Sequence, residues 1–268
     1  MDSKLVKDDI LKKCLNLCEL NNSELVFCCE SGSRSWGYSS ETSDYDVRGI
    51  YIRKRSEYVY SLFGKENDKG VLEIDIKSEV SLLETYNEKK YDIVLWDIKK
   101  VINLYFKNGN QMPIWWLTSD IVYFDSELAL TVKQFFMKKN NTILDKIAAH
   151  CYGLIMQKIS QPVTFKNYIY IWRAVLFADC TIKTNKTPDT QNIINLSQNA
   201  TEEVKIIIDE LIDCFKNKNN FKEEEYKPNL DLLNSYIKNI KKFITENKTS
   251  KFIFDKDWEI LINNIWMN

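Results

Sequence analysis

The feature that most constrains the fold is the stretch 25–53, which reads LVFCCESGSRSWGYSSETSDYDVRGIYIR. It begins with an apolar run, Leu25–Cys29, that is typical of a buried strand. Gly32 and Ser33 then predict a tight turn that leads into a short helix. Acidic and apolar residues alternate from Asp44 to Ile52, which predicts a second strand. The stretch therefore predicts strand, turn, short helix and strand.

The second predicted strand carries two carboxylates on one face. Successive side chains of a strand point to opposite faces, so Asp44, Asp46 and Arg48 share one face. Tyr45 and Val47 take the other face. Two adjacent carboxylates repel each other unless a cation lies between them, and hard oxygen ligands favour Mg²⁺ or Mn²⁺. This strand therefore predicts a metal site.

The turn before the short helix has complementary chemistry. A glycine at position 32 lets the backbone approach a phosphate closely, and the start of a helix after Ser33 presents unpaired N–H groups. A phosphate-binding turn that faces two metal-binding acids is the arrangement needed for nucleotidyl transfer with two metal ions. Either motif alone is more often part of a solvated surface, whereas their joint occurrence at this spacing favours catalysis.

Composition limits the class of protein. The chain has 268 residues, of which 44% are hydrophobic and 13% aromatic, enough for one large domain or two small ones. Its 37 basic and 38 acidic side chains give a net charge of −1, so no global positive field indicates a long nucleic acid as partner. Seven scattered cysteines without CxxC spacing predict reduced thiols. Because neither a signal core nor a run of 18 apolar residues occurs, we expect a soluble, cytoplasmic protein without a membrane partner.

Periodicity predicts the remaining elements. Apolar residues at helical spacing over 5–20 predict a helix that packs on the sheet. Asp97 is the predicted N-cap of a helix that runs to residue 106. Further strands are predicted at 71–77, 91–95 and 121–124, and further helices at 126–138, 142–161, 165–182, 201–217, 229–247 and 256–266. We therefore predict an α+β fold, with a catalytic domain over 1–125 that contains a small mixed sheet and a helical domain over 126–268.

Several segments resemble a known family. GSRSWGYSSETSDYDVRGIYI resembles the signature of DNA polymerase β-type nucleotidyltransferases, and its GSRxxG and SDxDxRG patterns are similar to those of the RNA repair pathway DNA polymerase β family. YDIVLWDIKKVINLYFKNGN, SDIVYFDSE and TFKNYIYIWRAVLFADC also fit this family. The resemblance covers about residues 25–180 and implies a polymerase β-like nucleotidyltransferase core, while the C-terminal 80 residues or so match nothing recognisable.

The resemblance implies roles for individual residues. Members of this family hold two divalent metals with the two carboxylates of the DxD motif and a third from a neighbouring strand, which implies Asp44, Asp46 and Asp92 as catalytic and metal-binding residues. Asp75, on another alternating strand, is the alternative third acid, and Asp97 is implied as a structural cap. The residues expected to contact the nucleotide are Gly32, Ser33, Arg34, Arg48, Lys166 and Arg173.

Two of these arginines are also singled out by their surroundings in the sequence. Arg48 lies on the acidic face of its strand, so we expect it to hold an acid in the empty site and to move toward phosphate when the site fills. Arg173 lies in an otherwise apolar helix and needs an anion or a carboxylate partner. It either contacts the triphosphate or stabilises the helical half. His150 and the pair Trp115–Trp116 are expected in the core rather than in catalysis or base stacking.

The first hypothesis for function is an Mg²⁺- or Mn²⁺-dependent enzyme that moves an NMP from an NTP to a hydroxyl and releases pyrophosphate. An RNA 3′ end, including that of tRNA, is the preferred acceptor. A protein side chain, as in antitoxin-type AMP transfer, comes second, and cyclic or oligomeric nucleotide synthesis comes third. The other hypothesis is a nucleotide-binding regulatory protein that has lost catalysis, because residues 110–116 read NQMPIWW where relatives read NPxxxEW or NPxxxEL.

Overall fold

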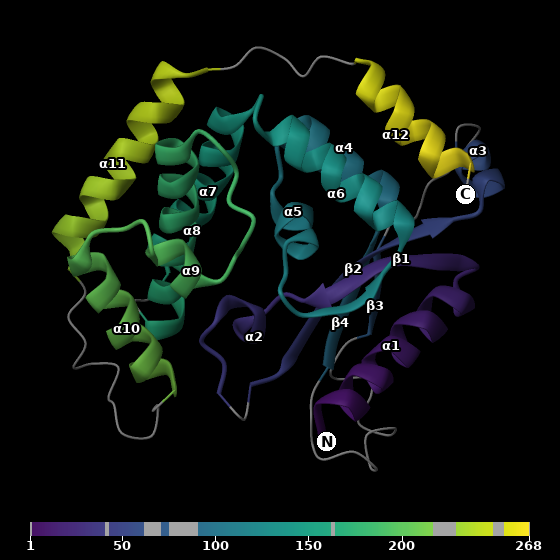
Figure 1. Cartoon of the computed structure of the whole chain (residues 1–268), viewed down its shortest axis with the longest axis horizontal. Coiled ribbons are helices and arrows are strands. Elements are labelled where there is room, and N and C mark those ends of the chain that lie inside the picture. Colours follow the sequence, from purple (N-terminus) through teal and green to yellow (C-terminus); the bar gives the residue numbers. More distant parts are fainter. Residues whose placement is uncertain are drawn as a thin grey trace.

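The computed structural model describes residues 2–40, 43–61, 71–74, 91–161, 164–216, 229–248 and 255–267. The predicted α+β fold is confirmed, with a mixed sheet formed by the first half of the chain and a helical C-terminal region (Figure 1). The sheet has the strand order β3–β4–β2–β1–β5. These strands are β1 (Ser23–Glu30), β2 (Tyr45–Arg53), β3 (Val71–Ile74), β4 (Tyr91–Asp97) and β5 (Val122–Asp125).

Strand direction decides which strand ends meet. β2 is antiparallel to β1 and parallel to β4, β5 pairs antiparallel with β1, and β3 pairs antiparallel with β4. The parallel pairing brings the first residues of β2 and β4 to the same edge of the sheet, with Asp46 opposite Asp92. The last residue of β1, Glu30, pairs with Val47 at this edge. Three strand ends therefore meet where the sequence places its acidic motif.

Helices cover both faces of the sheet. On one face lies α1 (Asp2–Leu20), whose buried side chains, such as Ile10 and Cys14, belong to the same apolar cluster as Val47 and Ile93 of the sheet. On the other face lie α4 (Ile98–Asn108), α5 (Met112–Leu117) and α6 (Glu127–Asn140). Trp115 and Trp116 of α5 are each only 1% exposed, so these indoles belong to the core as expected.

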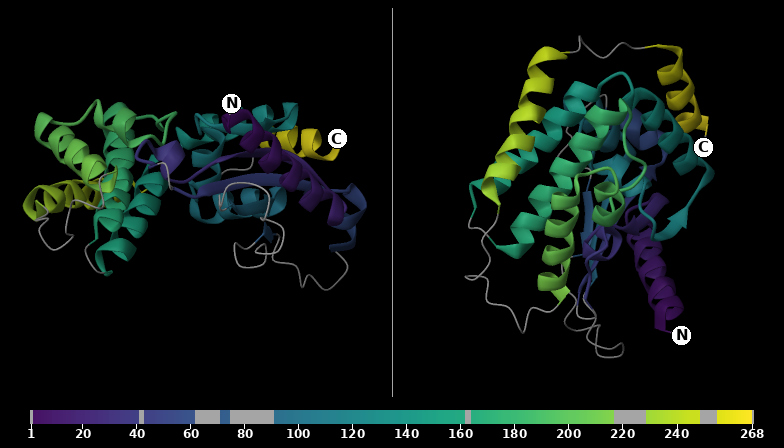
Figure 2. Two further views of the ribbon diagram at one scale, coloured as in Figure 1. Left: turned by 90° about the horizontal axis from the view of Figure 1, so that it is seen from below. Right: turned by 60° about the vertical axis from the view of Figure 1, so that its left-hand side comes forward.

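The remaining helices gather at one end of the sheet, as Figure 2 shows. They are α7 (Leu144–Ile159), α8 (Phe165–Thr184), α9 (Ile193–Ser197), α10 (Glu202–Lys216) and α11 (Leu230–Glu246). The last helix, α12 (Lys256–Met267), packs instead on α6, beside the sheet. One cluster of buried apolar side chains extends from Val26 to Ile265 and includes residues of both halves. The domain boundary at residue 125 stays a prediction.

The short helices differ most from the expectation. α2 (Ser33–Trp36) follows the Gly-Ser turn as predicted, whereas α3 (Arg55–Ser61), α5 and α9 were not predicted. Elements of five to seven residues make less than two turns, so no apolar repeat marks them in the sequence. Residues 75–77 of the predicted strand 71–77 lie outside the described part of the chain.

All seven cysteines are free thiols, and six of them are buried. No described helix is long and apolar enough to cross a membrane.

Candidate active site

The candidate site lies at the edge of the sheet where β2 and β4 begin. Asp46 and Asp92 are neighbours across the parallel pair, so their side chains share one face of the sheet. Both are partly exposed, with side-chain exposures of 36% and 33%. The tertiary fold thus brings together two acids that are 46 residues apart in sequence. The alternative third acid, Asp75, lies outside the described residues.

Arg48 bridges these two acids. Its Nη2 lies 2.7 Å from Asp92 Oδ2 and 3.9 Å from Asp46 Oδ1. Its Nη1 donates to the backbone carbonyls of Val47 and Asp92 at 2.9 and 2.8 Å. The guanidinium therefore supplies the positive charge that two neighbouring carboxylates need. The expected movement of Arg48 toward phosphate stays a prediction.

The protonation of Asp46 reflects this crowded position. Burial raises the pKa of the Asp46 carboxyl above its ordinary value, because it disfavours the charged form. The nearby Asp92 and Asp44 raise this pKa further, whereas Arg48 and Lys166 lower it. Positive charge near Asp46 therefore favours its ionised carboxylate. This is the form that binds a metal ion, whether or not the ion also contacts a phosphate.

The Gly32 turn packs directly on the Asp46 carboxylate. A Cβ at position 32 would lie 1.7 Å from Asp46 Oδ2, which no side chain could tolerate without displacing the acid. The two segments are also joined by a hydrogen bond from the Ser31 N–H to the Asp46 carbonyl at 2.8 Å. Glycine is required here for the close approach of two chain segments, as well as for any approach of a phosphate.

The residues after Gly32 hold the chain that leads into β2. Ser33 begins α2, and the helix ends at Gly37, whose φ of 92° favours glycine. The guanidinium of Arg34 donates to the Ser43 and Asp44 carbonyls at 2.6 and 3.3 Å and lies 4.1 Å over the Tyr45 ring. Asp44 itself is exposed and precedes β2. The contacts of Ser33, Arg34 and Asp44 with a nucleotide or metal stay predictions.

The helical half contributes two basic residues, Lys166 and Arg173, which lie in different surroundings. Lys166, exposed at the start of α8, interacts electrostatically with Asp46. Arg173, one turn beyond Tyr170 on α8, is only 5% exposed, and its guanidinium lies between the Trp36 and Trp115 rings at 4.0 and 4.5 Å. Its Nε and Nη1 have no hydrogen-bond partner in the described part of the chain. Lys166 is therefore close enough to Asp46 to favour its ionised form, whereas Arg173 is buried among aromatic side chains. The contacts of both residues with a nucleotide stay predictions.

Sequence reasoning missed Glu30. This residue ends a buried strand and is fully buried, yet its carboxylate accepts hydrogen bonds from the Asp46 and Gly32 N–H groups at 2.9 and 3.3 Å. The one signal in the sequence is an acid at the end of an apolar run, immediately before the Gly-Ser turn.

His150 is half-buried against Trp115. Burial lowers its pKa to about 4, so it is neutral at pH 7.

A comparison with protein families identifies the group to which this site belongs. The model of the RNA repair pathway DNA polymerase beta family matches residues 6–262. The chain belongs to this family. The match extends the resemblance at 25–180 to almost the whole chain, including the C-terminal helices. Membership of the RNA repair pathway DNA polymerase beta family supports a general role in nucleotidyl transfer.

Individual relatives are more distant. The uncharacterized protein YcgL of Bacillus subtilis is 28% identical over 254 residues, which cover 91% of this chain and 89% of that protein. A solved structure of a nucleotidyltransferase-like protein from Exiguobacterium sibiricum 255-15 has 8% sequence identity and a TM-score of 0.30, over 86% of this chain and 71% of that one.

Nucleotidyltransferases of this kind generally use divalent metals, and the oxygen donors here fit such an ion in part. Asp46 and Asp92 provide two hard carboxylate ligands side by side, around a positive charge that a guanidinium now supplies. Within the described ranges, no three His, Cys, Asp or Glu side chains are grouped closely enough to hold a metal as they stand. Two members of the predicted triad are therefore together, and the contribution of Asp44 stays a prediction.

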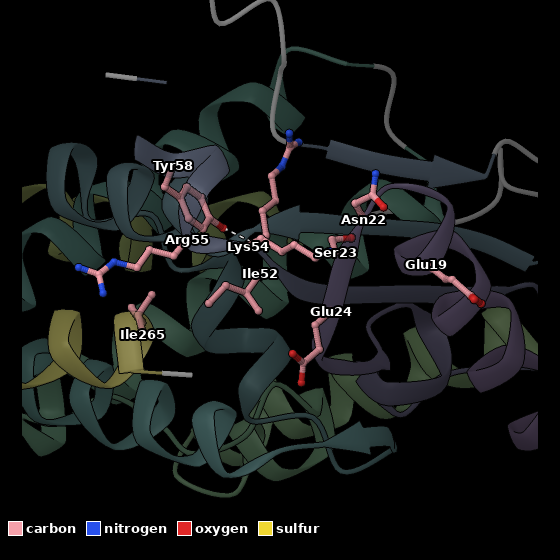
Figure 3. A pocket seen from close by; sticks show the side chains of 10 residues that line it. Glu19, Asn22, Ser23, Glu24, Ile52, Lys54, Arg55, Tyr58 and Ile265 are labelled. Atoms are coloured by element: carbon pink, nitrogen blue, oxygen red, sulfur yellow. Dashed lines mark hydrogen bonds between the residues drawn. The ribbon is translucent and has the colours of Figure 1, made fainter. Parts of the chain in front are cut away.

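A separate pocket of about 430 Å³ lies at the opposite end of β2 and contains none of the predicted site residues (Figure 3). Arg53, Lys54 and Arg55 line it together with Tyr58. The Tyr58 hydroxyl donates to Asp97 at 3.0 Å, and Asp97 also accepts from the Lys99 N–H and pairs with Arg53. Asp97 is therefore the helix cap that was predicted, and it stabilises the sheet at the end remote from Asp46.

Proposed function

We propose that this protein transfers a nucleoside monophosphate from an NTP to the hydroxyl of an RNA 3′ end, tRNA included, and releases pyrophosphate. The observation that carries the proposal is the position of Asp46 and Asp92 side by side, with the Gly32 turn against the Asp46 carboxylate. Phosphoryl-type transfer depends mainly on positioning and on stabilisation of developing charge. An acid pair beside a glycine turn is suited to both tasks.

The carboxylates have the first role in this proposal. Asp46 and Asp92, with Asp44 as the third acid, would hold two Mg²⁺ or Mn²⁺ ions. When bound, such ions supply Lewis-acid charge at the α-phosphate and favour ionisation of the attacking hydroxyl. Arg48, which pairs with Asp92 and lies near Asp46, would hold these two acids together and would move toward phosphate when a nucleotide binds.

The remaining residues would bind the triphosphate. Ser33 and the backbone N–H groups after Gly32 would hold the β- and γ-phosphates, because glycine permits a close approach of the backbone. Arg34 and Lys166 would add positive charge, Lys166 through its proximity to Asp46. The choice of an RNA 3′ end rests on the description of the family, which names RNA repair.

The experiment compares the wild type with the double variant Asp44→Ala, Asp46→Ala. Each labelled NTP is incubated with pooled tRNA and Mg²⁺, and the RNA, protein and small-molecule products are separated. We expect label on RNA with the wild type and none with the double variant. The variant should melt close to the wild type, because the bond between Asp46 and Glu30 uses the backbone N–H. Asp209→Ala, an exposed acid of α10, is the control and should be fully active.

Other products would identify another function. Label on protein would indicate AMP transfer of the antitoxin type. Stabilisation of the protein by an NTP with no labelled product would indicate a nucleotide-binding protein that has lost catalysis. Undiminished labelling of RNA by the double variant would refute the assigned site.

A further inference from the structure

Glu30 is a buried acid that connects the two segments of the candidate site. Its side chain is 0% exposed. One oxygen, Oε1, accepts from the Asp46 N–H at 2.9 Å and from the Gly32 N–H at 3.3 Å. The other, Oε2, accepts from the Tyr123 hydroxyl at 2.7 Å. A single carboxylate therefore contacts the glycine turn, the start of β2 and strand β5.

The backbone of Glu30 is equally well held. Its N–H donates to the Ile121 carbonyl at 2.9 Å, and its carbonyl accepts from the Ser119 hydroxyl at 2.6 Å. Both partners lie in the segment between α5 and β5. The backbone that carries the carboxylate is therefore anchored independently of the Gly32 turn.

Burial of the Glu30 carboxylate costs free energy, and this cost is an argument that Glu30 has a specific role. A buried carboxylate without a cationic partner is unfavourable, and burial raises the pKa of Glu30 above its ordinary value. The groups that lower this pKa are the neutral hydrogen-bond donors Tyr123 and the Asp46 and Gly32 N–H groups. An apolar residue would fill the space, but it would leave the buried Gly32 N–H and the partly buried Asp46 N–H without this acceptor.

The two N–H groups belong to the Gly32 turn and to the start of β2. The distance between these two segments sets the position of the Asp46 carboxylate relative to the turn. Gly32 lies so close to the Asp46 carboxylate that no Cβ fits between them. A small shift of either segment would move the acid relative to the turn. Since catalysis by positioning is sensitive to displacements of about 1 Å, the separation of turn and acid needs a common anchor.

We propose that Glu30 is a positioning residue for nucleotidyl transfer, which uses one carboxylate oxygen to fix the Gly32 turn relative to the Asp46 carboxylate. This inference rests on the proposed function. Glu30 itself does not touch the substrate, because its side chain is fully buried and both oxygens already accept hydrogen bonds. Its effect is on the geometry of Asp46.

The test compares Glu30→Met with Glu30→Gln. Both side chains have nearly the volume of glutamate, but only glutamine retains an oxygen that accepts from the two N–H groups. We expect Glu30→Met to bind Mn²⁺ alone about ten-fold more weakly, by electron paramagnetic resonance, and to lose about 100-fold in kcat with little change in KM. Glu30→Gln should recover both quantities to within about five-fold of the wild type.

Asp97 supplies the matched control, because it is also a buried carboxylate that accepts hydrogen bonds, but at the remote end of the sheet. Asp97→Asn should lower Tm without changing Mn²⁺ affinity or kcat. If Glu30→Met does not fold, Tyr123→Phe replaces it, and the loss of one anchor of the carboxylate should lower kcat three- to ten-fold.

Two results would overturn the role of Glu30. One is an unchanged Mn²⁺ affinity and kcat in folded Glu30→Met, or an unchanged kcat in Tyr123→Phe if that variant is needed. The other is an equal loss in the Met and Gln variants, since the acceptor oxygen would then be irrelevant. A wild type that transfers no nucleotide would refute the proposed function instead, and the Mn²⁺ titrations would still decide whether Glu30 positions Asp46.

Discussion

At the scale of single residues, the site is organised by one cation between two acids. Arg48 bonds to the Asp92 side chain and to two backbone carbonyls, and it lies 3.9 Å from Asp46. Its side chain is 21% exposed, so solvent reaches it and weakens the ion pairs. We therefore expect Arg48 to order the two acids, and also to exchange a carboxylate for a phosphate when a nucleotide binds.

We predict that Arg48→Ala lowers NTP turnover by roughly 100-fold, because a charge next to the reacting phosphates is lost. The free energy of unfolding should fall by only about 1 kcal/mol, since the pairs are partly exposed. Arg48→Lys should restore only part of the turnover, because an ammonium lacks the planar fork. Steady-state kinetics and urea unfolding measure the two effects. Arg55→Ala, at an exposed position of α3, is the control, and normal turnover in Arg48→Ala would contradict the prediction.

At the scale of elements, the short helix α2 is the link between sheet and helical half. Trp36 of α2 packs edge-on against Tyr170 of α8 at 5.1 Å and donates from Nε1 to Gln191 at 2.9 Å. Arg173 stacks on the same indole and on Trp115 of α5. The turn that carries Gly32 is thereby held between the sheet and α8. The predicted contact of Arg173 with the triphosphate is still to be tested, and its stacking supports a stabilising role.

We predict that Arg173→Lys lowers the free energy of unfolding by about 2 kcal/mol, because a desolvated cation loses its contacts with two indoles and an ammonium is more strongly hydrated than a guanidinium. The matched variant is Arg34→Lys, whose guanidinium stacks on Tyr45 near the surface. It should cost no more than about 1 kcal/mol. Urea unfolding of both variants makes the comparison, and equal losses would show that burial of the stack is unimportant.

At the scale of the whole molecule, the last helix, α12, packs beside the sheet and apart from the other C-terminal helices. Trp258 of α12 is 1% exposed and packs edge-on against Phe135 of α6 at 4.5 Å. Lys139 of α6 pairs with Asp255 and, at 2.9 Å, with Asp257. Hydrogen bonds from Lys139 lower the pKa of both carboxyls below their ordinary value. The docking of α12 therefore combines an apolar contact with an acid-sensitive ion pair.

We predict that α12 detaches as the pH falls. A carboxyl whose pKa is lower in the folded than in the unfolded state stabilises the folded state above its unfolded pKa of about 3.9, and this stabilisation is lost as the pH falls through the folded pKa. Fluorescence of the wild type minus that of Trp258→Phe, from pH 7 to pH 3, reports the environment of Trp258. Lys139→Met should expose Trp258 already at pH 7. A Trp258 signal that is the same in this variant and the wild type at all pH values would exclude the ion pair as the cause.

The sequence by itself determined the elements whose signals are local. The alternation after Asp44, the glycine at position 32, the cap at Asp97 and the helical repeats of the second half each extend over a few residues, and the structure contains the corresponding elements. The family signature is similarly contiguous. A pattern within one segment records which face is buried, because periodicity is a property of neighbouring residues.

Only the tertiary structure decided which segments meet. The family resemblance implied Asp92 as the third acid, but its position beside Asp46 follows from the parallel register of β2 and β4. No local pattern records a pairing across 46 residues. The same holds for Glu30, which the sequence presents as the end of a buried strand, and for Arg173, whose aromatic partners come from α2 and α5. Contacts of this kind depend on the packing of the whole chain, because each partner is set by a different element.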